Sequence, residues 1–132
     1  MMNTDKNKQI GMYIHIPFCI RKCKYCDFVS EAASDFVHEN YINALIDEIN
    51  GYDAGQLEGY GLRSVFIGGG TPSAVKAEYI SRIMTAVKEH FADICGHLTE
   101  ITIECNPGTV TAENLRIYRD AGINRLSLCR TG

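Results

Sequence analysis

The fold is decided by the stretch Arg63-Ser-Val-Phe-Ile-Gly-Gly-Gly-Thr-Pro-Ser73. Its first half is rich in β-branched and aromatic side chains, so residues 63–67 are predicted to form a β-strand. The glycines and the proline that follow favour a loop. Apolar residues then recur at helical spacing over residues 77–91. They are Ile80, Ile83, Met84, Val87 and Phe91. The stretch therefore predicts a strand, a loop and a helix in succession.

The same unit recurs on either side of this stretch. A strand is predicted at residues 11–16 and a helix at residues 35–50. A third strand is predicted at residues 100–105, and a third helix at residues 112–121. A fourth strand is predicted to begin near Arg125. The chain is therefore predicted to hold three strand-helix units and a terminal strand.

Local signals mark the ends of two of these helices. In the first helix, Ser34 is expected to cap the amino end and Gly51 to end the helix. In the third helix, Thr111 is the expected cap and Gly122 the expected stop. The first helix is also expected to bury one apolar stripe. Its members are Val37, Tyr41, Leu45 and Ile49.

Strands that alternate with helices of this length pair in parallel through right-handed crossovers. The predicted fold class is therefore α/β, a parallel sheet with outer helices, and a partial (β/α) barrel fits best. A closed barrel of this kind takes about 250 residues. Residues 11–132 are thus expected to be the amino-terminal part of a truncated core domain, after a polar tail at residues 1–10. The last strand would be an unpaired edge, so the chain is expected to be a truncated product or to need a partner.

Composition and charge exclude several classes of protein. The 132 residues are 45% hydrophobic and 22% charged, which is typical of a globular domain and not of a disordered chain. The net charge of -3 gives no reason to expect nucleic acid as a partner. The longest charge-free apolar stretch, around residues 64–75, is too short to span a bilayer, and the first residues lack a signal-peptide core. We therefore expect a cytoplasmic protein with no integral membrane segment.

Three of the six cysteines lie close together, at Cys19, Cys23 and Cys26. In a reducing cytoplasm, closely spaced thiols are more often metal ligands or catalytic groups than disulfide partners. Three thiolates on a loop after the first strand can hold three corners of a 4Fe-4S cluster and leave one iron open. The positive charges of Arg21, Lys22 and Lys24 would lower the cost of holding this anionic group. The other cysteines, Cys95, Cys105 and Cys129, are expected to be small core hydrophobes.

Two other interpretations of the cysteine triplet stay open. A zinc site usually has four ligands and most often separates paired cysteines by two residues. Here the gaps are three residues and then two. His15, Cys105 or another ligand could still complete a zinc tetrahedron. The remaining interpretation is three unligated thiols that lie together by chance.

The glycine run at residues 68–70 follows the second predicted strand directly. Without side chains, these residues let backbone N–H and C=O groups approach a ligand closely. An ordinary turn between a strand and a helix explains the run equally well. The run lacks the glycine spacing of a dinucleotide site and the lysine of a P-loop.

Glu104 ends the third predicted strand. Alternation along the strand would place Thr102 and Glu104 on one face, and Ile101 and Ile103 on the other. A carboxylate that points into a barrel is costly unless it meets a cation or hydrogen-bond donors, which suggests a ligand. A strand-end glutamate that reaches solvent is the other interpretation.

The histidines supply no further ligands in this interpretation. His38, His90 and His97 lie among charged residues on predicted helices or a helix end, and are expected to be surface groups. His15, between two isoleucines, is expected to be a packed strand residue with a satisfied hydrogen bond.

The stretch Tyr13-Ile-His-Ile-Pro-Phe-Cys19, with Cys23, Tyr25 and Cys26, resembles the cluster loop of radical S-adenosylmethionine (SAM) enzymes. Within that superfamily it is most similar to the oxygen-independent coproporphyrinogen III oxidase group. The resemblance implies a 4Fe-4S cluster on the three cysteines. It also implies that the methionyl amino and carboxylate groups of SAM chelate the open iron, and that Tyr25 lies near the adenine.

The resemblance assigns further residues to SAM. Gly69, Gly70 and Thr71 take the positions that contact its methionyl amino group, and Glu104 and Tyr13 take cofactor contacts. An electron donor such as flavodoxin or ferredoxin is implied as a partner.

One departure points to a branch of the group. The decarboxylating oxidases carry another cysteine two residues after the third, whereas this chain continues Cys26-Asp27-Phe28. That sequence resembles the heme chaperone branch, which binds heme and passes it to an acceptor protein. The alternatives are a decarboxylating coproporphyrinogen III oxidase of porphyrin biosynthesis, an inactive truncated fragment, or a zinc-binding module. The resemblance covers residues 12–128, about the first third of a typical member, so this chain alone is expected to be catalytically incomplete.

Overall fold

The computed structural model describes residues 8–18, 31–108 and 110–128. Four strands form one parallel sheet in the order β1-β2-β3-β4. The strands are β1 (Lys8–Ile16), β2 (Tyr60–Gly69), β3 (Cys95–Cys105) and β4 (Arg125–Leu128). The helices are α1 (Glu31–Gly51), α2 (Ala77–His90) and α3 (Ala112–Asp120), with short 3-10 helices η2 (Ala54–Leu57) and η3 (Pro72–Ala74).

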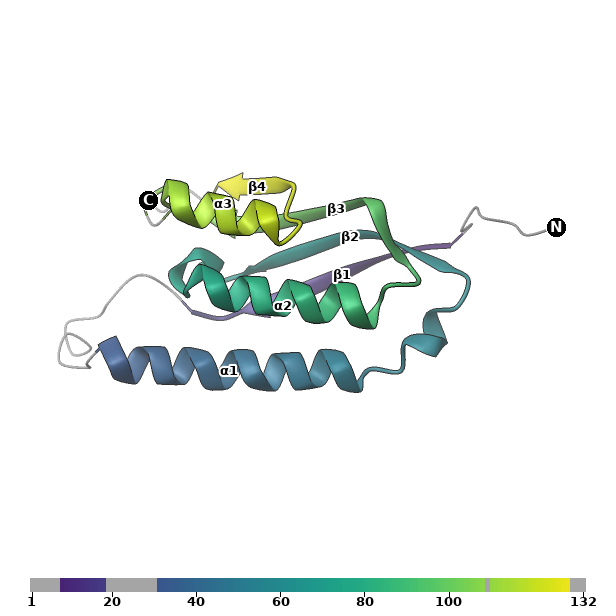
Figure 1. The fold of residues 1–132 in the computed structure, drawn as a ribbon, viewed down its shortest axis with the longest axis horizontal. Coiled ribbons are helices and arrows are strands. Elements are labelled where there is room, and N and C mark those ends of the chain that lie inside the picture. Colours follow the sequence, from purple (N-terminus) through teal and green to yellow (C-terminus); the bar gives the residue numbers. More distant parts are fainter. Residues whose placement is uncertain (1–7, 19–30, 109, 129–132) are drawn as a thin grey trace.

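The three α-helices cover one face of the sheet (Figure 1). Helix α1 packs against α2, and α2 against α3. All strands run in one direction, so their carboxyl ends lie at the same edge (Figure 1). The predicted fold class, parallel strands with outer helices, is therefore confirmed.

The core lies between the sheet and the helices. Alternate strand residues point into it and are almost fully buried. They include Ile14, Ile16, Val65, Ile67, Ile101 and Ile103. From α2 they meet Ile80, Ile83, Met84 and Val87, and Phe91 follows that helix in the same core. The predicted apolar face of this helix is thus confirmed, and the opposite face of the sheet carries the intervening residues.

Helix α1 differs from its prediction in two ways. It begins at Glu31, so Ser34 lies inside the helix and is not its amino-terminal cap. Val37 is 54% exposed, whereas Ile42 is fully buried and Ile49 nearly so. A spacing of four residues drifts around a helix that has 3.6 residues per turn, which is why the first member of the expected stripe falls outside the interface.

The signals at α3 are confirmed. The Thr111 side chain accepts a hydrogen bond from the backbone N–H of Asn114 at 3.0 Å, which satisfies one free donor at the helix start. Gly122 follows the helix with φ of +104°, a conformation that side chains disfavour. Asn124 then donates from its side chain to the carbonyl of Thr99 at 3.1 Å, and this bond joins the loop to β3.

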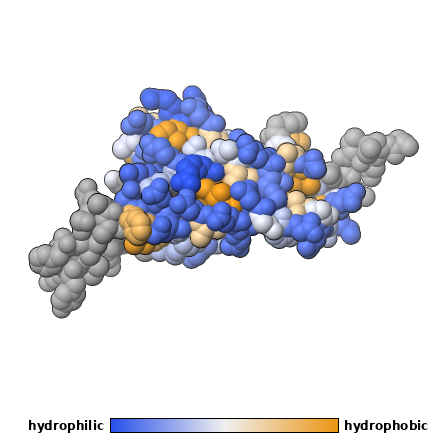
Figure 2. All heavy atoms as spheres, turned by 60° about the horizontal axis from the view of Figure 1, so that its bottom comes forward, coloured by the Kyte–Doolittle hydropathy of each residue, from blue (hydrophilic) through white to orange (hydrophobic). Residues whose placement is uncertain are grey.

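The exposed surfaces are polar on the helix side. The face turned forward in Figure 2 is largely hydrophilic, with smaller apolar areas scattered among the polar side chains. No helix in the described part of the chain is long and apolar enough to cross a membrane. The sheet ends at β1 on one edge and at β4 on the other, as far as the described strands extend.

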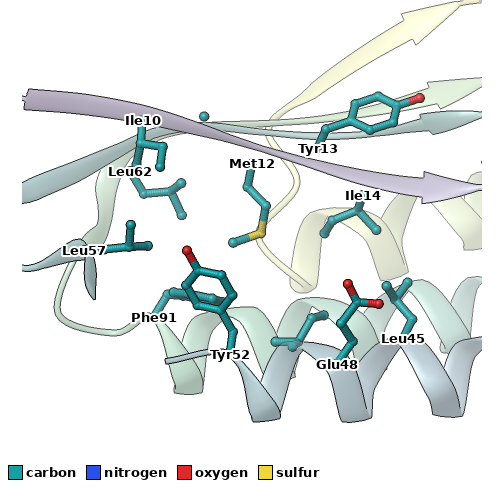
Figure 3. A pocket seen from close by; sticks show the side chains of 12 residues that line it. Ile10, Met12, Tyr13, Ile14, Leu45, Glu48, Tyr52, Leu57, Leu62 and Phe91 are labelled. Atoms are coloured by element: carbon teal, nitrogen blue, oxygen red, sulfur yellow. The ribbon is translucent and has the colours of Figure 1, made fainter. Parts of the chain in front are cut away.

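A cavity of about 260 Å³ lies between β1 and α1, on the helix side of the sheet (Figure 3). Most of its lining is apolar, with Glu48 reaching in from α1 and Tyr52 from the position that follows this helix. Met12 and Ile14 point into this side of β1, whereas Tyr13 points away from the helices (Figure 3). The figure therefore shows directly that Tyr13 belongs to the opposite face of the sheet.

Candidate functional site

The carboxyl ends of β1 and β2 bring the first two predicted motifs together. His15 pairs with Gly68, and Ile16 pairs with Gly69, in the parallel register. On β3, Ile103 pairs with Ile67, so the next residue, Glu104, comes level with Gly68. The glycine run therefore lies between the strand that leads to the cysteine loop and the strand that carries the carboxylate.

Gly68 forms the floor of a small cradle on the open face of the sheet. A Cβ atom placed on Gly68 would stand 2.8 Å from Glu104 Oε1, 2.8 Å from Phe66 Cε1 and 3.0 Å from the Tyr13 hydroxyl oxygen. Real Cβ atoms essentially never show contacts under 3.0 Å, and the contact with the Tyr13 hydroxyl would also be unusually tight. The absence of a side chain at this position is therefore what allows a carboxylate, an aromatic ring and a phenol to converge.

Gly69 has a separate reason to be glycine. Its φ is +127°, and a Cβ would stand 2.7 Å from the Ile16 carbonyl oxygen and 2.8 Å from His15 Nδ1. Its backbone N–H donates to Glu104 Oε1 at 3.0 Å. Glu104 is half-buried, so this bond fixes a carboxylate that would be costly to leave without donors.

The rest of the glycine loop is bonded to the end of β1. The Gly70 N–H donates to the Ile16 carbonyl at 2.9 Å, and the Thr71 N–H donates to the Phe18 carbonyl at 2.6 Å. With Gly69 bonded to Glu104, the N–H groups of residues 69–71 are all used within the protein. Of the two kinds of backbone group that the sequence analysis expects near a ligand, the N–H groups of residues 69–71 already have partners within the protein. What the loop can offer is carbonyl acceptors and close backbone approach, which suit a donor such as an ammonium group.

Tyr13 packs against Phe66, which is not among the residues predicted from the sequence. The Tyr13 ring stacks on the Phe66 ring with centroids 6.0 Å apart and planes 11° apart. Tyr13 and Phe66 are paired across β1 and β2, which is why the rings meet. Tyr13 is nevertheless 59% exposed, so its outer surface stays accessible. Strand alternation could have found Phe66, because it is two residues before Gly68 on the same face.

His15 lies on this same open face and is exposed, contrary to the packed position expected for it. Strand alternation places it with Tyr13, and the two isoleucines beside it point the other way into the core. Its ring centroid lies 6.1 Å from that of Tyr13. The backbone carbonyl of His15 accepts a hydrogen bond from the Tyr41 hydroxyl at 2.5 Å.

A second polar group joins α1 to α2 beside this end of the sheet. Asp35 accepts from the Tyr79 hydroxyl at 2.9 Å and from the Lys76 ammonium at 3.4 Å. The hydrogen bond from Tyr79 lowers the pKa of Asp35, and burial together with that bond raises the pKa of Tyr79 to about 12. Burial lowers the pKa of His38, one helical turn further on, although Asp35 opposes the shift. His38 is half-buried and not the surface group expected of it.

The structure thus brings together one part of the predicted site. Tyr13, Gly69, Gly70, Thr71 and Glu104 gather at the carboxyl ends of β1, β2 and β3. The other predicted residues, Cys19, Cys23, Tyr25 and Cys26, lie outside the described residues, as does Cys129.

The described residues also bear on the zinc alternative. Cys105 is fully buried in the core on the helix side of β3, as expected of a small hydrophobe, whereas His15 is exposed on the open face. The two residues therefore do not converge on one tetrahedral site. Within the described ranges, no group of three or more His, Cys, Asp or Glu side chains could hold a metal ion.

Comparison with known proteins gives a match over most of the chain. The family described as the radical SAM superfamily matches residues 13–128. Among curated proteins, the heme chaperone HemW of Escherichia coli (strain K12) is 38% identical over 120 residues, which are 90% of this chain and 31% of that protein. The heme chaperone HemW of Haemophilus influenzae is 42% identical over 123 residues, or 90% of this chain and 32% of that protein. The chain therefore spans about a third of the length of these relatives.

A solved structure shares the fold. It is that of coproporphyrinogen III oxidase (HemN) from Escherichia coli, whose title describes a radical SAM enzyme. The TM-score is 0.75 at 31% sequence identity, and the match covers 94% of this chain and 28% of that one. The similarity therefore extends over nearly all of the present chain.

Proposed function

The chain belongs to the radical SAM superfamily, and from this premise we propose that it binds a 4Fe-4S cluster and SAM as part of a heme-binding, heme-transferring protein. The proposed cluster ligands are Cys19, Cys23 and Cys26. The proposed SAM contacts are Tyr13, Tyr25, Gly69, Gly70, Thr71 and Glu104. Residues 11–132 would form part of a larger core domain, after a polar segment at residues 1–10.

The cradle over Gly68 is the single observation that carries the SAM half of this proposal. It presents a carboxylate oxygen, a phenol and an aromatic edge around a backbone with no side chain. The ammonium group of the SAM methionine needs acceptors, and the carbonyls of the glycine loop and Glu104 are acceptors. The described part of the site therefore fits the charge and the hydrogen-bonding groups of SAM.

The donor set fits an iron-sulfur cluster better than zinc. Three thiolates suffice for a cubic cluster with one open iron, whereas a structural zinc site takes a fourth ligand. Among the described residues, Cys105 does not offer that fourth ligand because it is buried on the other side of the sheet. When bound, the cluster would supply the electron that cleaves the sulfonium of SAM and releases a 5′-deoxyadenosyl radical.

The protein's own residues would orient SAM and limit access of water. Glu104 is held by the Gly69 N–H, so its carboxylate is already in place before a ligand arrives. Phe66 holds the Tyr13 ring by stacking, and this leaves the Tyr13 hydroxyl directed at Gly68. Both features reduce the ordering that binding would otherwise require.

Heme transfer is proposed as the output because the named relatives at 38% and 42% identity are heme chaperones. The absence of a cysteine two residues after Cys26 supports the same branch. A flavodoxin- or ferredoxin-type electron donor and a heme acceptor protein are the proposed partners. A reducing cytoplasm would keep the three thiols available, so we place the protein there.

Anaerobic reconstitution with iron and sulfide tests the cofactor proposal. We expect about four iron and four sulfide per chain, and an EPR spectrum of the reduced protein that changes when SAM is added. Stoichiometric zinc without sulfide would instead support the zinc-binding module. An EPR spectrum that does not change when SAM is added would contradict the proposal that the chain binds SAM.

A second experiment separates the two branches of the family. Heme added to the intact protein is expected to give a Soret band, and incubation with coproporphyrinogen III is expected to give no decarboxylated product. The decarboxylating oxidase is the alternative because HemN shares this fold. Decarboxylated product without a heme complex would favour that alternative.

A further inference from the structure

The cavity between β1 and α1 is separate from the proposed SAM site. It lies on the helix side of the sheet, whereas the cradle over Gly68 lies on the open face. Ile10 and Leu62, which line the cavity, pair near the amino ends of β1 and β2, whereas Gly68 is close to the carboxyl end of β2. Tyr13 borders both places, but its ring points away from the helices (Figure 3). The side chains of the proposed SAM contacts therefore do not occupy this cavity.

Apolar side chains form the walls of the cavity. Ile14, Leu62 and Phe91 belong to the core and are at most 4% exposed. Met12 and Leu57 are half-buried and lie beside them (Figure 3). The core residues cannot move without disturbing the packing between the sheet and the helices, so the cavity has a fixed floor.

An irregularity in the sheet shapes this floor. Ile10 pairs with Leu62, but the register shifts before Gly11, which leaves Arg63 as an extra residue in β2. Because of this extra residue, Leu62 and Val65 both point toward the helices although they are three residues apart. The bulge thus turns the Leu62 side chain into the cavity wall.

The volume of the cavity suits a small organic molecule. Protein interiors contain few voids larger than a water molecule. An engineered apolar cavity of about 150 Å³ in another protein binds benzene, and the volume here is about 260 Å³. The room therefore suffices for a single ring that carries a short chain.

Two polar groups stand where the cavity meets solvent. Glu48 and Tyr52 line the cavity and are both exposed. The Glu48 carboxylate and the Tyr52 hydroxyl both point from the helix side toward β1 (Figure 3). The Tyr52 ring packs against the Phe91 ring with centroids 5.7 Å apart, and the Tyr52 carbonyl accepts a hydrogen bond from His90 Nε2 at 2.5 Å. Tyr52 is therefore held in place at the mouth of the cavity.

The Glu48 carboxylate has no cationic partner among the described residues. The ion pairs in that part of the chain join Lys76 to Asp35 and Arg125 to Glu100. A carboxylate beside an apolar wall attracts a cation and repels an anion. The cavity therefore fits a molecule that has an apolar body and one ammonium group.

We propose that this cavity binds a small organic amine, with its apolar body between β1 and α1 and its ammonium group on Glu48. The Tyr52 hydroxyl can accept a second hydrogen bond from the ammonium group. The inference goes beyond the proposed function and does not depend on it, because neither the cysteines nor the cradle over Gly68 takes part.

Calorimetric titration of the intact protein with three probes tests this inference. The probes 2-phenylethylamine, 2-phenylethanol and 3-phenylpropionate have similar apolar bodies, and at pH 7 they carry a positive charge, no charge and a negative charge. We expect the Kd of the amine to be about tenfold below that of the alcohol. The carboxylate probe is expected to bind most weakly, because Glu48 repels it.

A spectroscopic readout places the bound probe. In protein labelled with methyl-¹³C methionine, the Met12 methyl signal is expected to shift as the amine is added, because Met12 lines the cavity. The Met84 signal is the internal control, since Met84 is fully buried on α2 and does not line the cavity. The Met12→Leu variant assigns the Met12 signal.

Two pairs of variants separate the charge from the space. Glu48→Gln is expected to raise the Kd of the amine about tenfold and to leave that of the alcohol unchanged. Asp47→Asn is its control, because it removes the same charge from the neighbouring exposed residue, which does not line the cavity. Leu57→Trp is expected to fill the cavity and raise the Kd of both probes at least about tenfold. Gln56→Trp, which adds the same ring at an exposed neighbour, is expected to change neither.

Several results would overturn the inference. They are an absence of saturable binding, equal Kd values for the three probes, or a Met12 signal that does not move at saturation. Thermal melts show whether each variant is folded, and if Leu57→Trp is not, the comparison of Glu48→Gln with Asp47→Asn still decides. The titrations need neither cluster nor SAM, so their failure would leave the proposed function intact, and failure of cluster reconstitution would leave this inference intact.

Discussion

Glu104 Oε1 accepts a hydrogen bond from the backbone N–H of Gly69 at 3.0 Å, across 35 residues of sequence. The bond joins the carboxyl end of β3 to that of β2. It also holds the carboxylate over Gly68, where a Cβ atom would stand 2.8 Å from the same oxygen. The position of the Glu104 carboxylate therefore depends on two adjacent glycines. Gly69 donates the hydrogen bond, and Gly68 leaves the room that a side chain would fill.

Gly68→Ala is expected to disturb the proposed SAM site. The new methyl group would displace Glu104, Phe66 or Tyr13, so SAM affinity should fall about tenfold, and the free energy of unfolding should fall by about 1–3 kcal/mol. Gly51→Ala is the control, because no atom lies within 4 Å of a Cβ there. Calorimetric titration with SAM and urea melts measure the two effects. Equal SAM affinity in both variants would contradict this account of the cradle.

Glu104→Gln is expected to weaken SAM binding without unfolding the protein. The amide oxygen can still accept from Gly69, so stability should change by less than about 1 kcal/mol, whereas the lost charge should raise the Kd for SAM about tenfold. Glu100→Gln is the matched control, because Glu100 is on the same strand but is more than half exposed and pairs with Arg125 at 3.9 Å. If Glu100→Gln weakened SAM binding as much, the effect would be one of general charge and not of the site.

Replacing each proposed ligand by serine is expected to reduce the iron content after reconstitution about tenfold. The three variants are Cys19→Ser, Cys23→Ser and Cys26→Ser. Cys95→Ser serves as the control because Cys95 is a half-buried thiol on β3. Iron and sulfide assays measure the outcome, and full iron content in any of the three variants would remove that residue from the ligand set.

The hydrogen bond between Asp35 and Tyr79 is expected to make the free energy of unfolding depend on pH in the acid range. The pKa of Asp35 in the folded protein is lowered from 3.8, so the stabilisation is present above that pH and is lost as the pH falls through the folded value. Tyr79→Phe removes the largest cause of the shift, while Lys76 and His38 stay near the carboxylate. The free energies of unfolding should differ at pH 6 and converge in strong acid. A constant difference across the acid range would contradict the linkage.

Tyr118 is a position at which a substitution is expected to stabilise the protein. Its side chain is 1% exposed, and within the described residues its hydroxyl has no hydrogen-bond partner. Burial raises the pKa of Tyr118, since an ionised phenol would be poorly solvated there. Tyr118→Phe is expected to raise the free energy of unfolding by about 1 kcal/mol in urea melts. A loss of stability would instead indicate a partner outside the described part of the chain.

Much of the fold could be predicted because its signals are local. Three of the four strands end at or within two residues of a glycine or proline. The apolar residues of α2 recur at helical spacing. Thr111 caps the start of α3, and Gly122 follows its end. Each of these signals acts within a few residues, through backbone sterics or a short hydrogen bond. The first residues of the strands are harder to predict. Strand β3 begins at Cys95, whereas the sequence predicts a start at residue 100. Hydrogen bonding to a neighbouring strand can extend a strand into residues that have a low β-propensity of their own.

The candidate site could be predicted only in part. The residue types at positions 13, 69–71 and 104 are visible in the sequence, and strand alternation predicts the face of Glu104. The position of His15 was misjudged, because the isoleucines beside it on both sides suggested burial when only alternate residues of a strand point into the core.

The sequence alone thus determined the order of strands, loops and helices and the chemical groups at their ends, since these follow from contacts between near neighbours in the chain. Only the tertiary structure decided that Phe66 stacks on Tyr13, that the Gly69 N–H meets Glu104, and that His38 packs on Phe18. These contacts join residues whose separation in sequence is closed by strand register and helix packing. Register and packing are set by burial of the whole core, which is a property of all the elements together.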